Sequence, residues 1–142
     1  MSEKNKDIIR RYYEDLWNPW NLEAANELIS PEMEFLGSLG ITVRGIEGFQ
    51  HYVSTVHSAF PDFHNQLVDL VAEGDKVVAR LTYTGTHQGE IFGLAPTGRA
   101  ITYPGIAVFR ISGDKIARGW VMGDRWGLFQ QLSGPVFPNS SA

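Results

Sequence analysis

The carboxylate of Asp124 is the side chain whose position in the sequence best fits acid/base chemistry. It ends a strand-like run, Trp120-Val-Met-Gly-Asp124. It shares one face of that strand with Trp120 and Met122, because strand side chains alternate with period two. Apolar surroundings desolvate a carboxyl group and raise its pKa, which makes it a usable general base near neutral pH. The same position fits the N-cap of a final helix, a structural role, although Gly127 removes the capping-box partner. Both interpretations stay open.

His87 is a second candidate for proton transfer. It continues the alternation of Leu81 and Tyr83, so the imidazole is predicted to point inward at the end of its strand. A histidine there either exchanges protons near neutral pH or is a hydrogen-bonded residue of the core or rim. Aromatic and apolar side chains of the helices and strands are predicted to form the wall of a substrate pocket: Tyr12, Tyr13, Trp17, Phe49, Val53, His57, Phe60, Tyr83, Tyr103, Trp120 and Met122.

Composition argues against several other functions. The 142 residues include no cysteine and four histidines without paired spacing, and no phosphate-binding loop, so neither a metal nor a cofactor is expected. The net charge of −4 and the absence of a basic segment argue against nucleic acid as a partner. A polar first segment and short apolar runs predict no signal peptide, no membrane span and a cytoplasmic location.

Helical patterns dominate the N-terminal part of the chain. Apolar residues recur at helical spacing over residues 4–18. A short second helix is predicted to end at Ser30-Pro31, and short strands follow near residues 34–36 and 41–43. A clear apolar stripe over residues 46–60 predicts a third helix.

The C-terminal part changes to the period of strands. Residues 64–72 and 77–87 form one predicted hairpin, and residues 101–111 and 116–124 form a second. Helices followed by antiparallel hairpins predict an α+β fold in which the helices cover one face of the sheet.

The chain length predicts one domain, over residues 1–132. Residues 133–142 are rich in Pro, Ser and Gly and are expected to form a flexible tail. The connection over residues 88–100 is longer than a tight hairpin needs, so it is either a lid or pocket rim or an inert loop.

Four segments resemble SnoaL-like polyketide cyclases: Phe60-Pro-Asp62, Thr86-His-Gln-Gly-Glu90, Gly93-Leu-Ala-Pro-Thr-Gly-Arg99, and Trp120 through Leu132. The similarity extends from the first helix to the end of the last segment. It implies the nuclear transport factor 2-like cone, in which a curved mixed sheet wraps over helices and encloses an apolar pocket. It also implies a homodimer.

The resemblance implies a reaction as well. In characterised cyclases of the family, an aspartate matching Asp124 is the acid/base in an intramolecular aldol condensation of an aromatic polyketide ester. The expected partner is therefore a small apolar carbonyl compound, and no cofactor or metal is required. Gly119 and Gly123 stand where many relatives carry a histidine and a bulky residue, which predicts extra space near Asp124. The contrasting hypothesis is a non-catalytic module of the same fold that binds an apolar ligand or serves as a dimerisation subunit.

Overall fold

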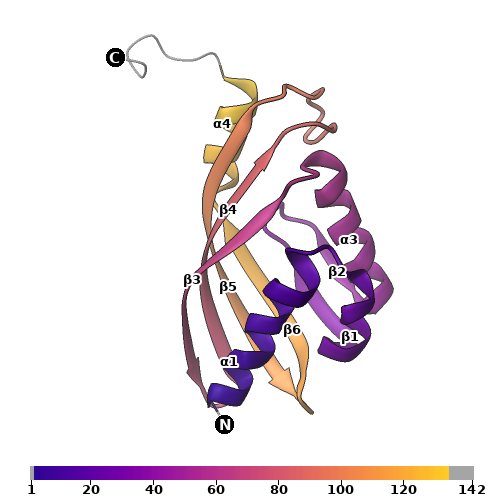
Figure 1. Cartoon of the computed structure of the whole chain (residues 1–142), viewed down its shortest axis with the longest axis vertical. Helices are drawn as coiled ribbons and strands as arrows, with labels where there is room; N and C mark the ends of the chain where they lie inside the picture. The colour runs from indigo at the N-terminus through magenta and orange to yellow at the C-terminus, as the bar shows by residue number, and fades with distance from the viewer. Residues whose placement is uncertain (1, 135–142) are drawn as a thin grey trace.

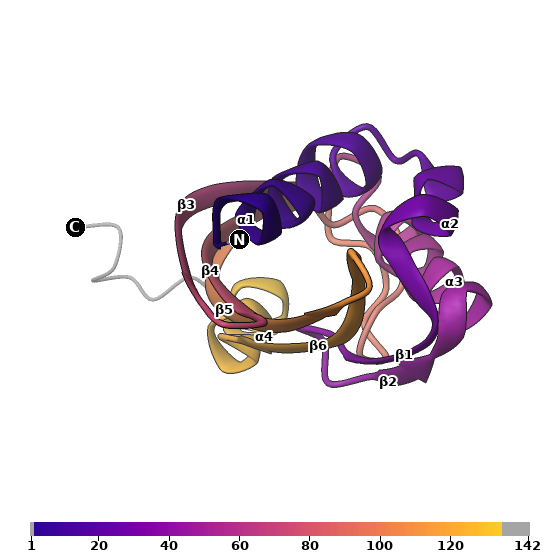
Figure 2. The same ribbon diagram turned by 90° about the horizontal axis from the view of Figure 1, so that it is seen from below.

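A curved six-stranded sheet wraps around the N-terminal helices in the computed structural model, which describes residues 2–134 (Figures 1 and 2). The strand order across the sheet is β2 (Thr42–Arg44), β1 (Ile29–Leu36), β6 (Lys115–Gly123), β5 (Ala100–Ser112), β4 (Lys76–Thr86) and β3 (His64–Glu73). Strands β1 and β6 are parallel, and the other neighbours are antiparallel. The α+β fold with a mixed sheet predicted from the sequence is confirmed. The predicted tail beyond Gly134 lies outside the described residues.

Four α-helices and two other helical segments accompany the sheet in this part of the chain: α1 (Ser2–Arg11), the π-helical η1 (Tyr12–Trp17), the 3-10 segment η2 (Leu22–Ala24), α2 (Ala25–Leu28), α3 (Gly45–Ala59) and α4 (Arg125–Ser133). The helix predicted over residues 4–18 is confirmed in extent as α1 and η1. Its last turns are π-helical, with the Asn18 N–H donating to the Tyr13 carbonyl oxygen at 2.9 Å. None of the described helices has the length and apolar character needed to cross a membrane.

Strand β1 corrects one prediction, because it begins before Ser30-Pro31 instead of following a helix that ends there. Pro31 lacks a backbone N–H and is excluded from the regular ladder of a central strand. It is tolerated because the register with β6 shifts between Ile29 and Glu34, and pairing with β2 starts only at Glu34. The proline therefore lies in the unpaired part of the strand.

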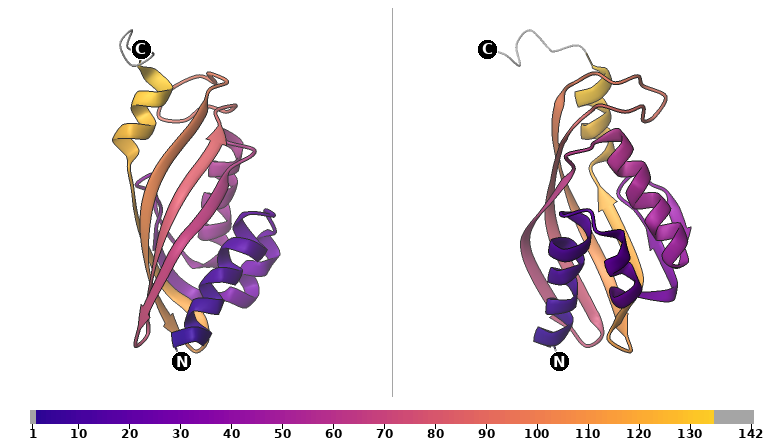
Figure 3. Two further views of the ribbon diagram at one scale, coloured as in Figure 1. Left: turned by 60° about the vertical axis from the view of Figure 1, so that its left-hand side comes forward. Right: turned by 45° about the vertical axis from the view of Figure 1, so that its right-hand side comes forward.

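The two long hairpins place the core on one face of the sheet. Buried residues alternate with partly exposed or exposed ones along β4, and mostly with exposed ones along β5. The buried set packs against α1, η1 and α3, which lie on the same side of the sheet, whereas α4 lies at one end (Figure 3). At the tip between β5 and β6, Gly113 and Asp114 have φ values of +58° and +63°, as tight hairpin turns require. Both predicted hairpins are confirmed.

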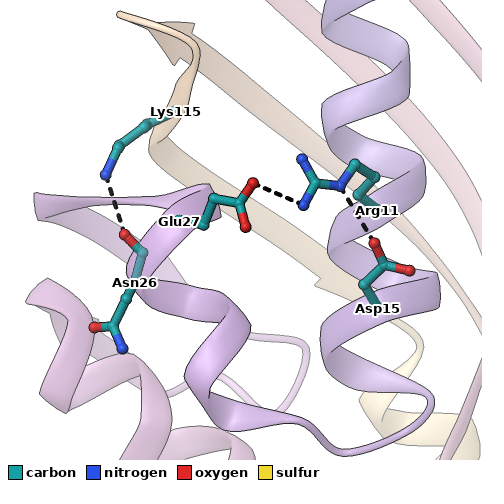
Figure 4. A network of polar contacts seen from close by, with 5 residues as sticks. All are labelled: Arg11, Asp15, Asn26, Glu27 and Lys115. Atoms are coloured by element: carbon teal, nitrogen blue, oxygen red, sulfur yellow. Dashed lines mark hydrogen bonds and ion pairs between the residues drawn. The ribbon is translucent and has the colours of Figure 1, made fainter.

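Polar contacts connect the first helices with each other and with the sheet (Figure 4). Arg11 donates to Asp15 at 3.2 Å and to Glu27 at 3.0 Å, and Lys115 donates to the backbone oxygen of Asn26 at 3.1 Å. These groups are exposed, so each ion pair adds at most about 1 kcal/mol. They link α1 to α2 and α2 to β6, whereas most of the stability comes from the buried core.

Candidate functional site

Asp124 forms the N-cap of α4. One carboxylate oxygen, Oδ1, accepts a hydrogen bond from the Gly127 N–H at 2.9 Å, and the Asp124 carbonyl accepts from Leu128 N–H at 3.0 Å. The Asp124 N–H donates to the Pro104 carbonyl at 3.0 Å, which ties the start of α4 to β5. The carboxylate is exposed. The capping interpretation is therefore confirmed. The sequence argument for a base depended on burial of the Asp124 carboxyl group, and this group is not buried.

Trp120 and Met122 lie on the outer face of the sheet, where they are 44% and 50% exposed. The prediction that they share a pocket wall with the aromatic residues of the helices is wrong. The alternation itself is as predicted, but it is Val121 that points to the helices. Met122 and Asp124 instead border an outer groove of about 380 Å³, next to Ile106.

An interior cavity lies between the sheet and the helices. Four of the predicted pocket residues line it: Tyr12, Tyr13, Trp17 and Tyr83. Its volume is about 20 Å³, which is room for about one water-sized group, since a single water needs about 10–15 Å³ on this measure. The cone therefore encloses a pocket, but in this conformation the pocket admits only one end of a ligand.

The other predicted wall residues have different positions. Phe49, Val53 and Phe60 are buried in the core without lining the cavity. Tyr103 is also buried, and its hydroxyl lies 3.0 Å from the Ser38 hydroxyl. The ring of His57 stacks on Trp20, with ring centroids 3.6 Å apart, at the outside of the helical layer. The apolar stripe of α3 and η1 was predicted correctly, but many of its side chains are packed in the core and do not line the cavity.

Several cavity residues were missed: Phe35, Ser38, Tyr52, Phe63 and Asn65. Tyr52 could have been found, because it follows Phe49 by three residues on the stripe of α3. Nothing in the sequence pattern marked Ser38 as a cavity residue, because it lies in an irregular turn that only the tertiary fold brings to the cavity. Its partner across the cavity wall is in a strand 65 positions away.

The polar groups of the cavity are mostly neutral hydroxyls. Tyr52 accepts a hydrogen bond from the Leu39 N–H at 3.3 Å. Desolvation by burial raises the pKa values of Tyr13, Tyr52, Tyr83 and Tyr103 above that of a free tyrosine. These phenols stay protonated at neutral pH and can donate hydrogen bonds. No carboxylate or histidine is among the described residues that line the cavity.

His87 points inward as predicted and is completely buried, but it is not among the cavity-lining residues. Its Nδ1 accepts from the Thr97 N–H at 3.1 Å and lies 3.0 Å from the Thr97 hydroxyl, so Nε2 carries the proton. That Nε2 atom has no partner among residues 2–134. The geometry fits a residue that anchors the loop over residues 88–99 better than a proton-transfer group.

The space predicted at Gly119 and Gly123 is already filled. A Cβ atom at Gly119 would lie 2.7 Å from the Phe35 ring, and one at Gly123 would lie 3.0 Å from Ser38 Cβ and 3.1 Å from the Tyr103 ring. The two glycines therefore allow close packing against β6 and do not create room beside Asp124. Within residues 2–134 there is also no group of three or more potential ligands that could hold a metal ion.

The comparison with known proteins decides the family. The family model for SnoaL-like polyketide cyclases matches residues 7–132. The chain belongs to the SnoaL-like polyketide cyclase family. The match covers all six strands of the curved sheet, and it includes both Asp124 and the loop that His87 anchors.

Two curated relatives of this SnoaL-like protein carry an enzymatic name. Aklanonic acid methyl ester cyclase AcmA of Streptomyces galilaeus is 32% identical over 129 residues, which is 89% of each chain. Aklanonic acid methyl ester cyclase DnrD of Streptomyces peucetius is 31% identical over 134 residues, 91% of this chain and 90% of the relative. A solved structure from Jannaschia sp. CCS1, named as a SnoaL-like polyketide cyclase, superposes with a TM-score of 0.87 at 20% identity and covers 94% of both chains. This last similarity bears on the fold alone.

Proposed function

We propose that the protein is an ester-cyclase-type enzyme that closes a ring in an apolar carbonyl compound by cofactor-free proton transfer. The observation that carries this proposal is the similarity to two aklanonic acid methyl ester cyclases over about nine-tenths of all three chains. The aromatic interior with its neutral hydroxyl groups supports it, since such surfaces suit planar carbonyl compounds.

Asp124 is the proposed acid/base, and its capping role is compatible with that chemistry. Oδ1 is held by the Gly127 N–H, whereas Oδ2 accepts no hydrogen bond from residues 2–134. The cap therefore orients the carboxylate and leaves one oxygen for a substrate. A Cβ atom at the preceding residue, Gly123, would lie 3.0 Å from Ser38 Cβ and 3.1 Å from the Tyr103 ring, so side chains of the interior lie next to this position. In this conformation Oδ2 is reached from the outer groove that Asp124 borders together with Met122.

The reaction would proceed in three steps. Asp124 takes a proton from a carbon between two carbonyl groups, where the negative charge delocalises onto oxygen, so a carboxylate of moderate basicity suffices. The resulting enolate carbon attacks a second carbonyl carbon of the same molecule, forming the ring bond and an alkoxide. The protonated Asp124 then returns the proton to that alkoxide, so the product is an isomer of the substrate. Holding the chain bent supplies proximity.

The test is the cyclisation of aklanonic acid methyl ester by the wild type and by Asp124→Asn, followed by chromatography of the product. Asparagine keeps the cap acceptor and removes the base, so the rate should fall by a factor of at least about 100, the lower end of general-base contributions. Asp124→Ser, which also caps the helix without a carboxylate, should show a loss of the same size. A rate in Asp124→Asn equal to that of the wild type would exclude Asp124 as the base. A wild type without turnover would exclude this ester as substrate.

A further inference from the structure

The glycine at position 127 lies inside a helix whose backbone does not require glycine there. Gly127 is the third residue of α4. Glycine is one of the least favourable residues in a helix, because folding costs it the most backbone entropy. Gly127 is not among the glycines with positive φ, so any other residue could adopt its backbone conformation. The reason for glycine at this position must therefore lie in the space around its Cα atom.

The carboxyl group of Asp124 occupies that space. A Cβ atom at residue 127 would lie 2.2 Å from Oδ2 of Asp124, 2.8 Å from its Cγ and 3.2 Å from Oδ1. Apart from the backbone of the helix itself, these are the three heavy atoms nearest to that position. Contacts of a Cβ atom below 3.0 Å essentially do not occur in proteins, so a side chain at residue 127 would displace this carboxyl group.

The displacement would fall mainly on the oxygen that is proposed to take the proton. The shortest of the three distances involves Oδ2, whereas Oδ1 accepts the cap bond from the Gly127 N–H. An aspartate side chain has several staggered rotamers, so the conflict would be relieved by rotation of the Asp124 side chain. The helix would remain in place, and Oδ2 would point in a different direction.

We propose that Gly127 is a positioning residue, whose missing side chain leaves the space that holds Oδ2 of Asp124 toward the outer groove. This inference rests on the proposed function, in which Asp124 is the acid/base. A general base must lie within hydrogen-bond reach of the proton that it removes, and a displacement of about 1 Å can lower a rate by about 100-fold. Gly127 acts on the reaction only through the direction of this carboxylate.

The test is Gly127→Ala, with Gln130→Ala at an exposed position of the same helix as the matched control. NMR couplings over three bonds, from Cγ of Asp124 to its backbone N and carbonyl carbon, report the rotation of the side chain. In Gly127→Ala these couplings should change. The kcat for aklanonic acid methyl ester should fall at least about tenfold, with a smaller change in KM, because the carboxylate acts in the transition state. Gln130→Ala should match the wild type in both measurements.

A measurement on the wild type covers the case in which Gly127→Ala fails to fold. The α hydrogen of Gly127 that a Cβ atom would replace points at Oδ2, and the second α hydrogen points in another direction. When Asp124 takes up a proton, the chemical shift of the first hydrogen should change more than that of the second, and Asp124→Asn should abolish this difference.

Three results would overturn the proposal: equal shifts of the two α hydrogens in the wild type, unchanged couplings in folded Gly127→Ala, or an unchanged kcat in that variant. A wild type without turnover would instead refute the proposed function. The couplings and the α-hydrogen shifts need no substrate, so they would still decide whether Gly127 determines the direction of the Asp124 carboxylate.

Discussion

At the scale of single residues, Asp124 has two oxygens with different surroundings. Oδ1 caps α4 through the Gly127 N–H, and Oδ2 is free of partners in the described part of the chain. The sequence offered capping and catalysis as alternatives, and the geometry makes them compatible. For His87, the inward direction of the side chain was predicted correctly from the sequence. Its hydrogen bonds with Thr97 favour a structural role over proton transfer.

The cap predicts a specific pattern of stability. Asp124→Ala should lower the free energy of unfolding by about 1 kcal/mol, the usual value of a lost N-cap, whereas Asp124→Asn should change it by only a few tenths, because asparagine caps about as well as aspartate. Urea denaturation of the three proteins measures the difference. Equal stability of Asp124→Ala and the wild type would show that the cap bond contributes nothing. A loss in Asp124→Asn as large as in Asp124→Ala would show that the negative charge is what matters.

At the scale of elements, the segments that carry the family resemblance hold the ends of strands and helices in place. Around Thr97, the His87 N–H donates to the Arg99 carbonyl and the Gly98 N–H donates to the His87 carbonyl, at 2.9 and 2.8 Å. The Arg99 guanidinium donates to the backbone oxygens of Gln131 and Gly134, both at 3.0 Å. The loop over residues 88–99 is thereby fixed to both β4 and the C-terminal end of α4. This favours a fixed rim over a loose connection.

Asp62 makes a similar connection between the end of α3 and the end of β4, and it predicts a pH dependence. Desolvation acts to raise its pKa, but hydrogen bonds from the Thr86 hydroxyl and N–H outweigh it, so the pKa falls below 3.8. A lowered carboxyl pKa gives stability that is present above pH 3.8 and is lost as the pH falls through the folded-state value.

The matched variant for this prediction is Asp62→Asn. It should be less stable than the wild type at pH 6, and the difference should shrink as the pH falls below about 4, because the wild type then loses the same charged acceptor. Chemical denaturation at a series of pH values measures it. A difference that is constant with pH would show that the carboxylate charge does not contribute.

The elements were predictable because they depend on local patterns. Period-two alternation and glycine turns identified β3 to β6, and the apolar stripe identified α3. The side of the sheet on which Trp120 and Met122 lie was not predictable, because alternation gives two faces without saying which one the helices cover. The continuation of β1 through Pro31 also depends on a register shift that only the neighbouring strands determine.

At the scale of the whole molecule, the outer sheet face exposes several large apolar side chains. Ile106, Trp120 and Met122 are 48%, 44% and 50% exposed, and they border neighbouring grooves of about 380 and 470 Å³. Exposed apolar patches of this kind often mark interaction surfaces. We propose that a second copy of the chain covers this face around Trp120, at the larger groove, and leaves the Asp124 end of the smaller groove open to a substrate. The volume of the interior, by contrast, could not be read from the sequence, since it depends on how all the rings pack together.

The proposed dimer gives a direct prediction. The wild type should have twice the mass of one chain in light scattering at micromolar concentration. Trp120→Lys should be a folded monomer, because the interface would bury a positive charge beside Arg110 and Arg118. Glu14→Gln is a suitable surface control, because Glu14 is exposed in η1, on the helical side of the molecule. A monomeric wild type would contradict the proposal.

The interior also predicts the response to alkaline pH. Burial raises the pKa of all five tyrosines of the chain, so each is held protonated in the folded state. Groups with raised pKa values give stability that is complete below the unfolded-state value of about 10 and is lost above it. Absorbance of tyrosinate should therefore appear together with the loss of the circular dichroism signal. Ionisation of most tyrosines before unfolding would show that the interior is open to water.

The most direct test of the account is whether the protein transfers a proton through Asp124. Aklanonic acid methyl ester is incubated in D₂O with the wild type or with Asp124→Asn, and deuterium incorporation at the carbon that forms the new ring bond is followed by NMR. The wild type should accelerate exchange over the buffer rate, and Asp124→Asn should lose at least about 100-fold of that acceleration. Equal acceleration by the two proteins would contradict the account and leave Asp124 as a helix cap alone.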